Sequence, residues 1–543
     1  FEADGMVGVR GSVFSGLVAV RNLRAAIGSL GLLEDARWEV DFRLAAKERQ
    51  FERAVVLAHR LRLEAFADDG LVTPDQPITV SALVANSGDA DVVVRQVSLT
   101  GFDRTSVACG EGVLAAADVY RCSAELRIPA ETPLTSIHWS HVSGAARYSF
   151  DAAVPFGMPF RPTPFRATFE IEFASGRVSI ERPIQHRYAD DIFAGEKRMT
   201  LQVVPRFAVE ITPQIAIIPE AARAVREIRV TVTNTGPEPV EGEIGLELPA
   251  GWRMTPGPAT VQFSSEDESK TIRFEVSSGD APIGEYQIRA VVRAAGTRFD
   301  RGYQVVTYPH IGRRHLVRPS EATFKVVDVT VAPDLSVGYI TGVGDAVPPA
   351  IDQLGARLEL IDADDLAWGD LTRFDVIVTG VRAYERRMDL RANNDRLLDY
   401  VADGGTVIVQ YNKFEFNDAQ YGPYPAQVSR SRVTDEAAPI RVVANDHPVF
   451  TWPNLIDAET WSDWVQERGL YFLGDRDQTY VDLVELEDNF SWNPGIKRGA
   501  LVEAKYGQGR WLYVGLGLWR QLPAGTIGAY QLLANLLSLG TAN

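Results

Sequence analysis

Long apolar runs and basic clusters are both missing from this sequence of 543 residues. No stretch of about 18 apolar residues occurs, so no membrane-spanning helix is predicted. The formal net charge is −17, and Lys/Arg clusters are lacking beyond the pairs Arg313–Arg314 and Arg386–Arg387. Because a phosphate backbone needs a basic face, this charge balance argues against nucleic acid as a partner.

Cysteine is scarce as well, with only Cys109 and Cys122. The two residues flank GEGVLAAADVYR, which is typical of a hairpin or loop. A disulfide across it would contribute about 3 kcal/mol by restricting the unfolded chain, and it would require an oxidising compartment. Two free, half-buried thiols are the alternative, and the sequence leaves both open because it does not place the two Cα atoms.

The start, FEADGM, lacks an initiator Met, a charged segment and an apolar segment. We therefore expect a processed or partial product, or a true start that was not available. The composition that is present is ordinary for globular proteins, with 45% hydrophobic and 23% charged residues. For a chain of 543 residues it predicts about three or four domains.

Hydrophobic periodicity divides the chain into domains. A helical period, with Leu17, Val20 and Leu23 on one face, predicts a pair of helices at the start. Alternation with period two, broken by Asp-Gly and Ser-Gly turns, then predicts β-sandwiches. Strands alternating with helices predict a parallel sheet near the end. The predicted domains are a helical segment at 1–60, a β-sandwich with a long irregular insertion at 61–204, an Ig-like β-sandwich at 205–308, a linker at 309–321, and a flavodoxin-like α/β domain at 322–543 with an insertion at 412–500.

Polar and aromatic residues follow several strands of the predicted α/β domain. Ligands of open α/β sheets bind outside the carboxyl ends of the strands, and this mixture of side chains suits a polar ligand such as a sugar. The alternative is that loops at strand ends are polar in any case, with a structural ion pair between Arg382 and Glu385. The candidate ligand-binding residues are Asp345, Arg382, Tyr384, Glu385, Tyr411, Asn412, Trp519, Arg520 and Gln521.

A complete catalytic site is missing. The predicted α/β domain contains no Cys and no G-x-S-x-G elbow, which excludes the common thiol and serine arrangements. His447 has no identifiable nucleophile, and we interpret it as a structural residue beside its Pro. His138 and His141 offer a weak two-ligand spacing, whereas His310 and His315 fall in the predicted linker. We assign no catalytic residue and no metal ligand.

Three tryptophans, Trp461, Trp464 and Trp492, occur in the predicted insertion. Exposed rings there could stack on sugar faces. Such residues more often pack an insertion onto its domain. The sequence favours packing over stacking for these three rings.

Several segments resemble, in order, one known arrangement. They include DARWEVDFRLAAKERQFERAVVLA, PFGMPFRPTPFRATFEIEF, DDIFAGEKRMTLQVVP and GLWRQLPAGTIGAYQLLANLLSLG. Over nearly the whole chain they resemble the region C-terminal to the catalytic domain in large, secreted bacterial PIG-L (LmbE-like) family deacetylases. LPAGW with PIGEYQIRAVV resembles Ig-like domains of secreted glycan-active enzymes. The last domain resembles class I glutamine amidotransferases, although its elbow, VIVQYNKF, lacks their Cys.

The PIG-L resemblance implies hydrolysis of the N-acetyl group of amino-sugar conjugates by a zinc ion in an N-terminal domain. The family's A-H-P-D-D-E-type zinc run has no counterpart here, and His59 is not followed by Pro-Asp-Asp. No family catalytic residue is therefore carried over. Zinc is expected only in a missing catalytic domain upstream of this chain.

The expected function is a non-catalytic accessory region that positions such a deacetylase on a glycan. The expected location is secreted, periplasmic or at the cell surface. Its expected partners are a glycan or polysaccharide, the upstream deacetylase domain or a cleaved fragment, and further copies of itself. Two alternatives stay open: a hydrolase that uses Glu385 as base and Arg382 as anion holder, and a structural or assembly protein of the cell surface.

Overall fold

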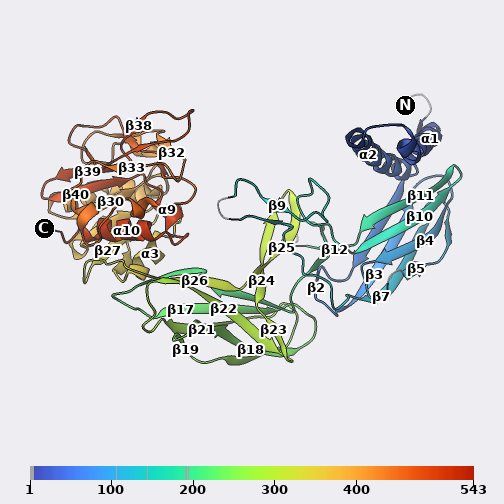
Figure 1. Cartoon of the computed structure of the whole chain (residues 1–543), viewed down its shortest axis with the longest axis horizontal. Coiled ribbons are helices and arrows are strands. Elements are labelled where there is room, and N and C mark those ends of the chain that lie inside the picture. Colours follow the sequence, from blue (N-terminus) through green and yellow to red (C-terminus); the bar gives the residue numbers. More distant parts are fainter. Residues whose placement is uncertain (1–4, 105–106, 143–144, 190–192, 194, 543) are drawn as a thin grey trace.

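The computed structural model describes all residues except 1–4, 105–106, 143–144, 190–192, 194 and 543, so parts of the FEADGM start and of the DDIFAGEKRMTLQVVP segment lie outside it. The chain is β-rich and multidomain, with the helical start and the C-terminal α/β unit at opposite ends (Figure 1). Buried side chains form four hydrophobic clusters among the described residues. No helix in that part of the chain is long and apolar enough to cross a membrane.

Two helices open the chain and share a core with the first sandwich. Leu17 and Val55, both fully buried, belong to that core. Glu48 of the second helix binds Arg21 and Arg24 of the first, with N–O distances of 2.8 and 2.6 Å. The elements are α1 (Gly5–Ala26), the 3-10 turn η1 (Ile27–Ser29) and α2 (Glu34–Ala58).

The first sandwich packs two sheets whose strands bury every second residue, as in RATFEIEF. One sheet has the order β13-β12-β1-β3-β7, and the other has the order β11-β10-β4-β5 with β6 beside β4. The strands are β1 (Leu61–Ala67), β3 (Pro77–Asn86), β4 (Val92–Thr100), β5 (Val107–Cys109), β6 (Gly112–Leu114), β7 (Val119–Arg127), β10 (Arg166–Phe173), β11 (Gly176–Pro183), β12 (Gln185–Tyr188) and β13 (Lys197–Thr200), with the small pairs β2 (Leu71–Val72) and β14 (Gln202–Val203), and β8 (Trp139–Ser140) and β9 (Ser149–Phe150).

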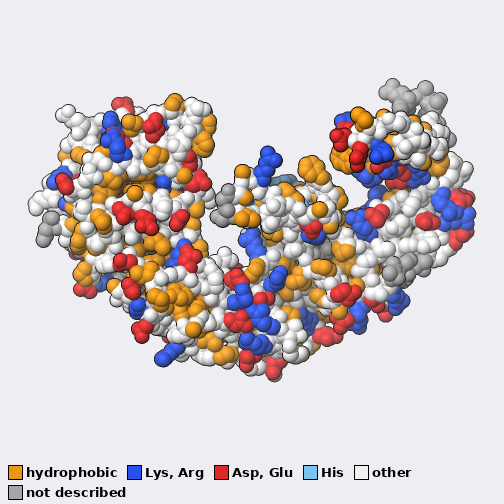
Figure 2. Space-filling view, in the orientation of Figure 1, with side chains coloured by type: hydrophobic (Ala, Val, Ile, Leu, Met, Phe, Trp, Pro, Cys, Tyr) orange, Lys and Arg blue, Asp and Glu red, His pale blue; other side chains and the backbone are white. Residues whose placement is uncertain are grey.

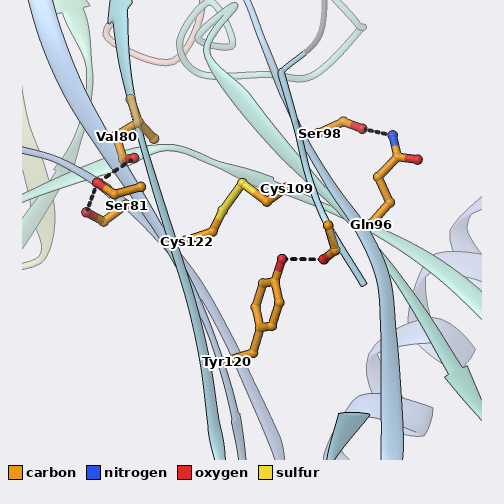
Figure 3. The surroundings of a disulfide bond; sticks show 9 residues. Val80, Ser81, Gln96, Ser98, Cys109, Tyr120 and Cys122 are labelled. Carbon is orange, nitrogen blue, oxygen red and sulfur yellow. Dashed lines mark hydrogen bonds between the residues drawn. A yellow bond between two sulfur atoms is a disulfide. The ribbon is translucent and has the colours of Figure 1, made fainter. Parts of the chain in front are cut away.

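A disulfide joins the two sheets of this sandwich. Cys109 on β5 and Cys122 on β7 have Cα atoms 6.3 Å apart (Figure 3). Of the two alternatives that the sequence left open, the structure therefore has the disulfide. Beside it, the Tyr120 hydroxyl donates a hydrogen bond of 2.6 Å to the Gly110 carbonyl. The short strand β5 is thus held covalently to the opposite sheet.

The second sandwich extends further along the chain than the sequence indicated. Its sheets have the orders β15-β17-β21-β19 and β16-β26-β22-β18-β20, with β23 beside β22. The strands are β15 (Phe207–Thr212), β16 (Ile215–Pro219), β17 (Arg226–Asn234), β18 (Val240–Glu247), β19 (Arg253–Thr255), β20 (Ala259–Phe263), β21 (Ser269–Ser277), β22 (Gly284–Ala294), β23 (Thr297–Phe299) and β26 (Glu321–Val327). Basic and acidic side chains intersperse over its surface (Figure 2).

The predicted linker at 309–321 is instead a β-hairpin. β24 (Arg301–Tyr308) and β25 (Ile311–Pro319) pair in antiparallel register, and Glu321 already begins β26 of the sandwich. The hairpin has few buried side chains, so its sequence, YPHIGRRHLVRPSE, is polar and lacks the alternation of a core strand. This polarity is why the sequence predicted a linker. The tip of the hairpin projects from the sandwich toward the irregular segment around β9 (Figure 1).

The C-terminal unit is built on a seven-stranded sheet of order β28-β27-β29-β30-β40-β39-β36. The first five strands pair in parallel, and β39 and β36 join through antiparallel pairs. The strands are β27 (Ser336–Ile340), β28 (Arg357–Leu360), β29 (Val376–Thr379), β30 (Thr406–Gln410), β36 (Val481–Asp482), β39 (Leu501–Tyr506) and β40 (Gly509–Val514). The helices are α3 (Val347–Leu354), α4 (Ala363–Trp368), α5 (Ala383–Arg386), α6 (Met388–Ala392), α7 (Asn394–Ala402), α8 (Pro448–Thr451), α9 (Leu518–Gln521) and α10 (Ile527–Ser538), with 3-10 turns η2 (Leu371–Arg373), η3 (Phe414–Asn417) and η4 (Glu459–Trp461).

The stretch between β30 and β39 carries three small sheets. They comprise β31 (Gln427–Val428) with β35 (Leu473–Gly474), β32 (Arg432–Val433) with β34 (Gly469–Leu470), and β33 (Ile440–Val442) with β37 (Val484–Glu487) and β38 (Ile496–Lys497). Trp461 and Trp464 are buried in the core that includes α10, whereas Trp492 is 66% exposed. Two of the three tryptophans thus pack the insertion onto the sheet.

The second sandwich is joined to the α/β unit by part-buried polar contacts. The Ile217 amide on β16 donates to Gln353 Oε1 on α3 at 2.6 Å. Arg226 on β17 donates to the carbonyls of Ile217 and Gln353 at 2.8 and 2.6 Å, and burial lowers the pKa of this guanidinium. Because these groups are hydrogen-bonded to each other, this junction leaves them satisfied without water.

Candidate functional site

The carboxyl ends of the parallel strands meet at one edge of the α/β sheet. Relative to chain order, the five strands run 2-1-3-4-5, so the order reverses between β27 and β29. Such a reversal point is where open α/β sheets place their ligands. All nine predicted ligand-binding residues follow β27, β29, β30 or β40.

Asp345 ties the loops after β27 and β29 together. Its Oδ1 accepts hydrogen bonds from the Tyr339 hydroxyl at 2.7 Å and the Val347 amide at 3.1 Å, and its Oδ2 accepts one from the Val381 amide at 3.0 Å. Gly342 lies so close that an added Cβ would come within 2.0 Å of the Val381 carbonyl oxygen. The two loops thus occupy the reversal point themselves, and Asp345 is committed to holding them.

Arg382 and Glu385 form a two-point ion pair. Arg382 Nε donates to Glu385 Oε2 at 2.6 Å, and its Nη2 binds the other oxygen. The hydrogen bonds from Arg382 hold the pKa of Glu385 below its ordinary value. A carboxylate held in this way is a weak base near neutral pH, so the pair supports binding better than proton abstraction.

Tyr384 and Asn412 are buried supports of the edge. The Tyr384 hydroxyl donates to Asn394 Oδ1 at 2.7 Å, and the Tyr384 amide donates to Asn412 Oδ1 at 3.1 Å. Asn412 is fully buried and donates from Nδ2 to the Gln410 carbonyl at 2.9 Å. Both side chains therefore hold the loops after β29 and β30 against each other and do not face solvent.

Four aromatic rings cluster at this edge, and we call them the aromatic platform: Tyr411, Phe414, Tyr471 and Trp519. The ring centroid of Tyr411 lies 4.3 Å from that of Trp519 and 5.8 Å from that of Tyr471, with an interplanar angle of 11° to the latter. Phe414 meets Tyr471 edge-on at 5.8 Å and is 38% exposed. Tyr471 and Trp519 are half-buried, so the platform offers apolar faces to solvent.

Arg520 and Gln521 hold the insertion beside the platform. Arg520 donates to Glu467 Oε1 and Gln466 Oε1, each at 2.5 Å. The buried Gln521 donates to the Val465 and Glu467 carbonyls and accepts from the Val465 amide. Arg520 and Glu467 thus form a second ion pair on the rim of the platform. It joins the loop after β40 to the insertion, whereas Arg382 and Glu385 both follow β29.

The nine predicted residues therefore divide into three groups. Two are rings of the platform, namely Tyr411 and Trp519. Three are charged groups of its rim, namely Arg382, Glu385 and Arg520. The other four are supports of the edge, namely Asp345, Tyr384, Asn412 and Gln521. The sequence did not indicate Phe414, Tyr471 or Glu467. Phe414 stands three residues after Tyr411 and continues the same loop, a signal that was available, whereas Tyr471 and Glu467 reach the edge only through the fold of the insertion.

The histidines do not gather into a site. His447 caps α8, since its Nδ1 accepts a hydrogen bond of 3.2 Å from the Val449 amide. His138 is buried whereas His141 is exposed and lies against Tyr148, with centroids 4.7 Å apart. Across the described ranges, no three His, Cys, Asp or Glu side chains are grouped so that they could hold a metal ion.

Comparisons with known proteins show no family for this chain. No family model matches it, and no curated protein matches it. Among solved structures, it is similar to a β-galactosidase from Rahnella sp. R3 (16% identity, 36% of this chain and 30% of that chain, TM-score 0.23) and to a red sea bream transglutaminase (13%, 50% and 33%, 0.22). An Escherichia coli α2-macroglobulin matches at 11% identity over 64% of this chain and 32% of that one, with a TM-score of 0.19.

The chain spans about a third of the length of each of these matched structures. At TM-scores this low, the matches do not establish a shared overall fold.

Proposed function

We propose that this chain is a non-catalytic glycan-positioning region that serves a zinc-dependent deacetylase of the PIG-L family. We propose further that its C-terminal unit is flavodoxin-like and binds a neutral amino-sugar polymer on the aromatic platform. The observation that carries the proposal is the platform itself: partly exposed rings lie at the carboxyl edge of the sheet, between two ion pairs.

Ring faces and rim charges suit complementary parts of a sugar. The apolar face of a pyranose ring packs on an aromatic face, and the apolar area that this buries contributes about 25 cal/mol per Å². The rim groups, Arg382–Glu385 and Arg520–Glu467, offer donors and acceptors to hydroxyl and acetamido groups. Because each of these four charges is already paired, they favour a neutral polymer over a strongly charged one.

Two further observations support a positioning role. Glu385 is held by Arg382 with its pKa lowered, which suits recognition better than general base catalysis. The Cys109–Cys122 disulfide suits the oxidising environment of a secreted, periplasmic or cell-surface protein.

Affinity electrophoresis of the full chain tests the proposal. In native gels that contain glycol chitin, a soluble N-acetylglucosamine polymer, we expect the chain to be retarded. Trp519→Ala should weaken the binding about tenfold, because the platform loses the half-buried ring that packs on Tyr411. Trp492→Ala removes an exposed tryptophan outside the platform and is the matched control, for which we expect full retardation. Equal retardation of wild type and Trp519→Ala, or no retardation in gels of any cell-wall or capsular polysaccharide, overturns the proposal.

A further inference from the structure

A second groove lies far from the aromatic platform, between the irregular segment that precedes β10 and the β24–β25 hairpin. Three adjoining cavities of about 100, 560 and 210 Å³ form it, and all three are lined by Arg161 and Arg314. We call this composite the arginine groove. Its smallest and most enclosed part is also lined by Trp139, Phe160 and His315.

Gln202 joins the two walls of the groove. Its Nε2 donates to the Arg313 carbonyl at 2.9 Å, and its Oε1 accepts from the His315 amide at 2.6 Å. The side chain is almost fully buried. Because Gln202 belongs to the first sandwich and its partners to β25, the groove forms only where the hairpin docks on that sandwich.

Arg314 lies in the groove without a carboxylate partner among the described residues. Its Nη1 donates to Thr200 Oγ1 at 2.9 Å, and its guanidinium carbon stands 4.6 Å over the Phe160 ring. Its Nε is buried and has no hydrogen-bond partner. Burial lowers the pKa of Arg314, but a guanidinium keeps its charge in a protein. The Nε–Nη2 edge thus has a buried donor, Nε, without a partner, on a half-buried guanidinium that no carboxylate of the described residues pairs with.

The other arginines of the groove are neutralised. Arg161 pairs with Asp151 at 2.6 Å, and Arg166, which lines the two larger cavities, pairs with Glu181. The absence of a counter-charge at Arg314 is therefore specific to that position and is not a general property of the groove.

His315 provides a second unmatched group. It is 4% exposed, lines the same cavity, and its Nδ1 has no hydrogen-bond partner in the described part of the chain. Its ring packs edge-on against Tyr303 at 4.9 Å. Buried polar atoms are normally hydrogen-bonded, so two unmatched ones on adjacent residues indicate a missing partner.

We propose that the arginine groove binds a carboxylate-bearing saccharide, with the carboxylate on the Nε–Nη2 edge of Arg314. A carboxylate is planar and matches the two parallel donors of a guanidinium edge. His315, protonated on Nδ1, then donates a hydrogen bond to a hydroxyl or carboxylate oxygen of the same sugar unit. Trp139, 39% exposed, stacks on a sugar ring at the mouth.

The charge of the chain makes this site selective. With a net charge of −17, the surface as a whole repels anions, so an acidic saccharide gains affinity only where a cation is locally unmatched. The site goes beyond the neutral polymer proposed for the platform, and the two stand or fall separately because they share no residue.

Calorimetric titration of the full chain with tri-galacturonate tests the site. We expect binding that the fully methyl-esterified trisaccharide lacks. Arg314→Gln should lower the affinity at least tenfold, and Arg314→Lys, which keeps the charge but not the fork, should lower it less. The matched control is Arg318→Gln, on the same strand but exposed and outside the groove, and it should leave the affinity within twofold.

Several outcomes overturn the proposal. One is the absence of tri-galacturonate binding by a chain whose thermal unfolding is normal. Another is equal affinity of wild type and a folded Arg314→Gln. Titrations with inorganic phosphate and with sulfate complete the test, because Arg314-dependent binding of either anion without tri-galacturonate binding rejects the carboxylate in favour of a tetrahedral oxyanion. Retained binding by Trp519→Ala separates this result from the proposed function.

Discussion

The platform edge and the arginine groove place arginine in opposite electrostatic settings. At the edge, Arg382 and Arg520 are each bound by a glutamate on a neighbouring turn or loop. In the groove, Arg314 meets a hydroxyl and an aromatic ring. Paired arginines build a rim whose net charge is small, whereas an unpaired one leaves a charge for a ligand to match. In the two proposals, the same residue type therefore serves the recognition of a neutral ligand at one site and of an anion at the other.

The two regions are assembled by the same device, a buried glutamine. Gln521 fixes residues 465–467 of the insertion beside the platform, and Gln202 fixes β25 against the first sandwich. A glutamine suits both places because one side chain supplies a donor and an acceptor to a passing backbone.

The largest effect is expected at these glutamines. Gln521→Leu removes three hydrogen bonds and leaves the Val465 amide and the Glu467 carbonyl without these partners, while the Val465 carbonyl keeps the Glu467 amide; the free energy of unfolding of the α/β unit should fall by about 3 kcal/mol. Gln202→Leu breaks two hydrogen bonds, so we expect a loss of about 2 kcal/mol at the hairpin contact. Urea unfolding followed by tryptophan fluorescence measures both. A smaller loss for Gln521→Leu than for Gln202→Leu contradicts this account.

Acid should weaken the groove and leave the platform edge intact. Burial first, and the nearby Arg313 charge second, lower the pKa of His315 from 6.5 to about 4. The unfolded chain therefore takes up this proton first, and stability falls as the pH drops from about 6.5 to about 4, by up to about 3 kcal/mol. Urea midpoints between pH 7 and pH 4 measure the loss. His315→Leu should flatten that slope, and an unchanged slope in this variant shows that another group is responsible.

A carboxylate introduced beside Arg314 should pair its charge, as Glu385 pairs that of Arg382 at the platform edge. Thr200→Asp places an acidic group at the position whose hydroxyl now lies 2.9 Å from Arg314 Nη1. The internal ion pair should reduce tri-galacturonate affinity about tenfold, which corresponds to about 1.4 kcal/mol. Thr200→Asn has nearly the same shape without the charge and is the control in the titration. Equal losses in the two variants would mean that shape, not charge, governs the site.

The smallest effect is expected for the edge ion pair. Glu385→Gln removes the partner of Arg382, but the side chains are 25% and 19% exposed, so we expect less than about 1 kcal/mol of lost stability. Chemical denaturation of the two proteins measures the change. A stability loss above about 3 kcal/mol would contradict the part-exposed setting of the pair. Glu385→Gln also leaves Arg382 as an unpaired cation. In the Arg314→Gln background, we therefore expect this variant to bind tri-galacturonate weakly at the edge.

Patterns of apolar residues predicted the main helices and strands, because an element that buries one face repeats its apolar residues with the period of a helix or a strand. Alternation in RATFEIEF corresponds to β10, and the apolar face with Leu17 corresponds to α1. The hairpin of β24 and β25 was not predicted from such a pattern. It docks on the first sandwich through hydrogen bonds between residues more than a hundred positions apart, such as the bond from the His315 amide to Gln202.

The candidate site was foreseeable only in part. Loops after parallel strands could be read from the sequence, which identified Tyr411 and Trp519 at the platform. Polarity alone did not separate a buried support such as Asn412 from a part-exposed rim group such as Arg382, because burial depends on the neighbouring loops. Arg314 was visible only as part of a short basic pair, since the absence of a counter-charge is a property of the folded surroundings.

We propose that the chain carries two glycan sites of different charge preference. Affinity electrophoresis in parallel gels, one with glycol chitin and one with polygalacturonate, tests it most directly with Trp519→Ala and Arg314→Gln. We expect Trp519→Ala to lose retardation only in glycol chitin, and Arg314→Gln to lose it only in polygalacturonate. Loss of both interactions in either folded variant, or of neither in both, contradicts it.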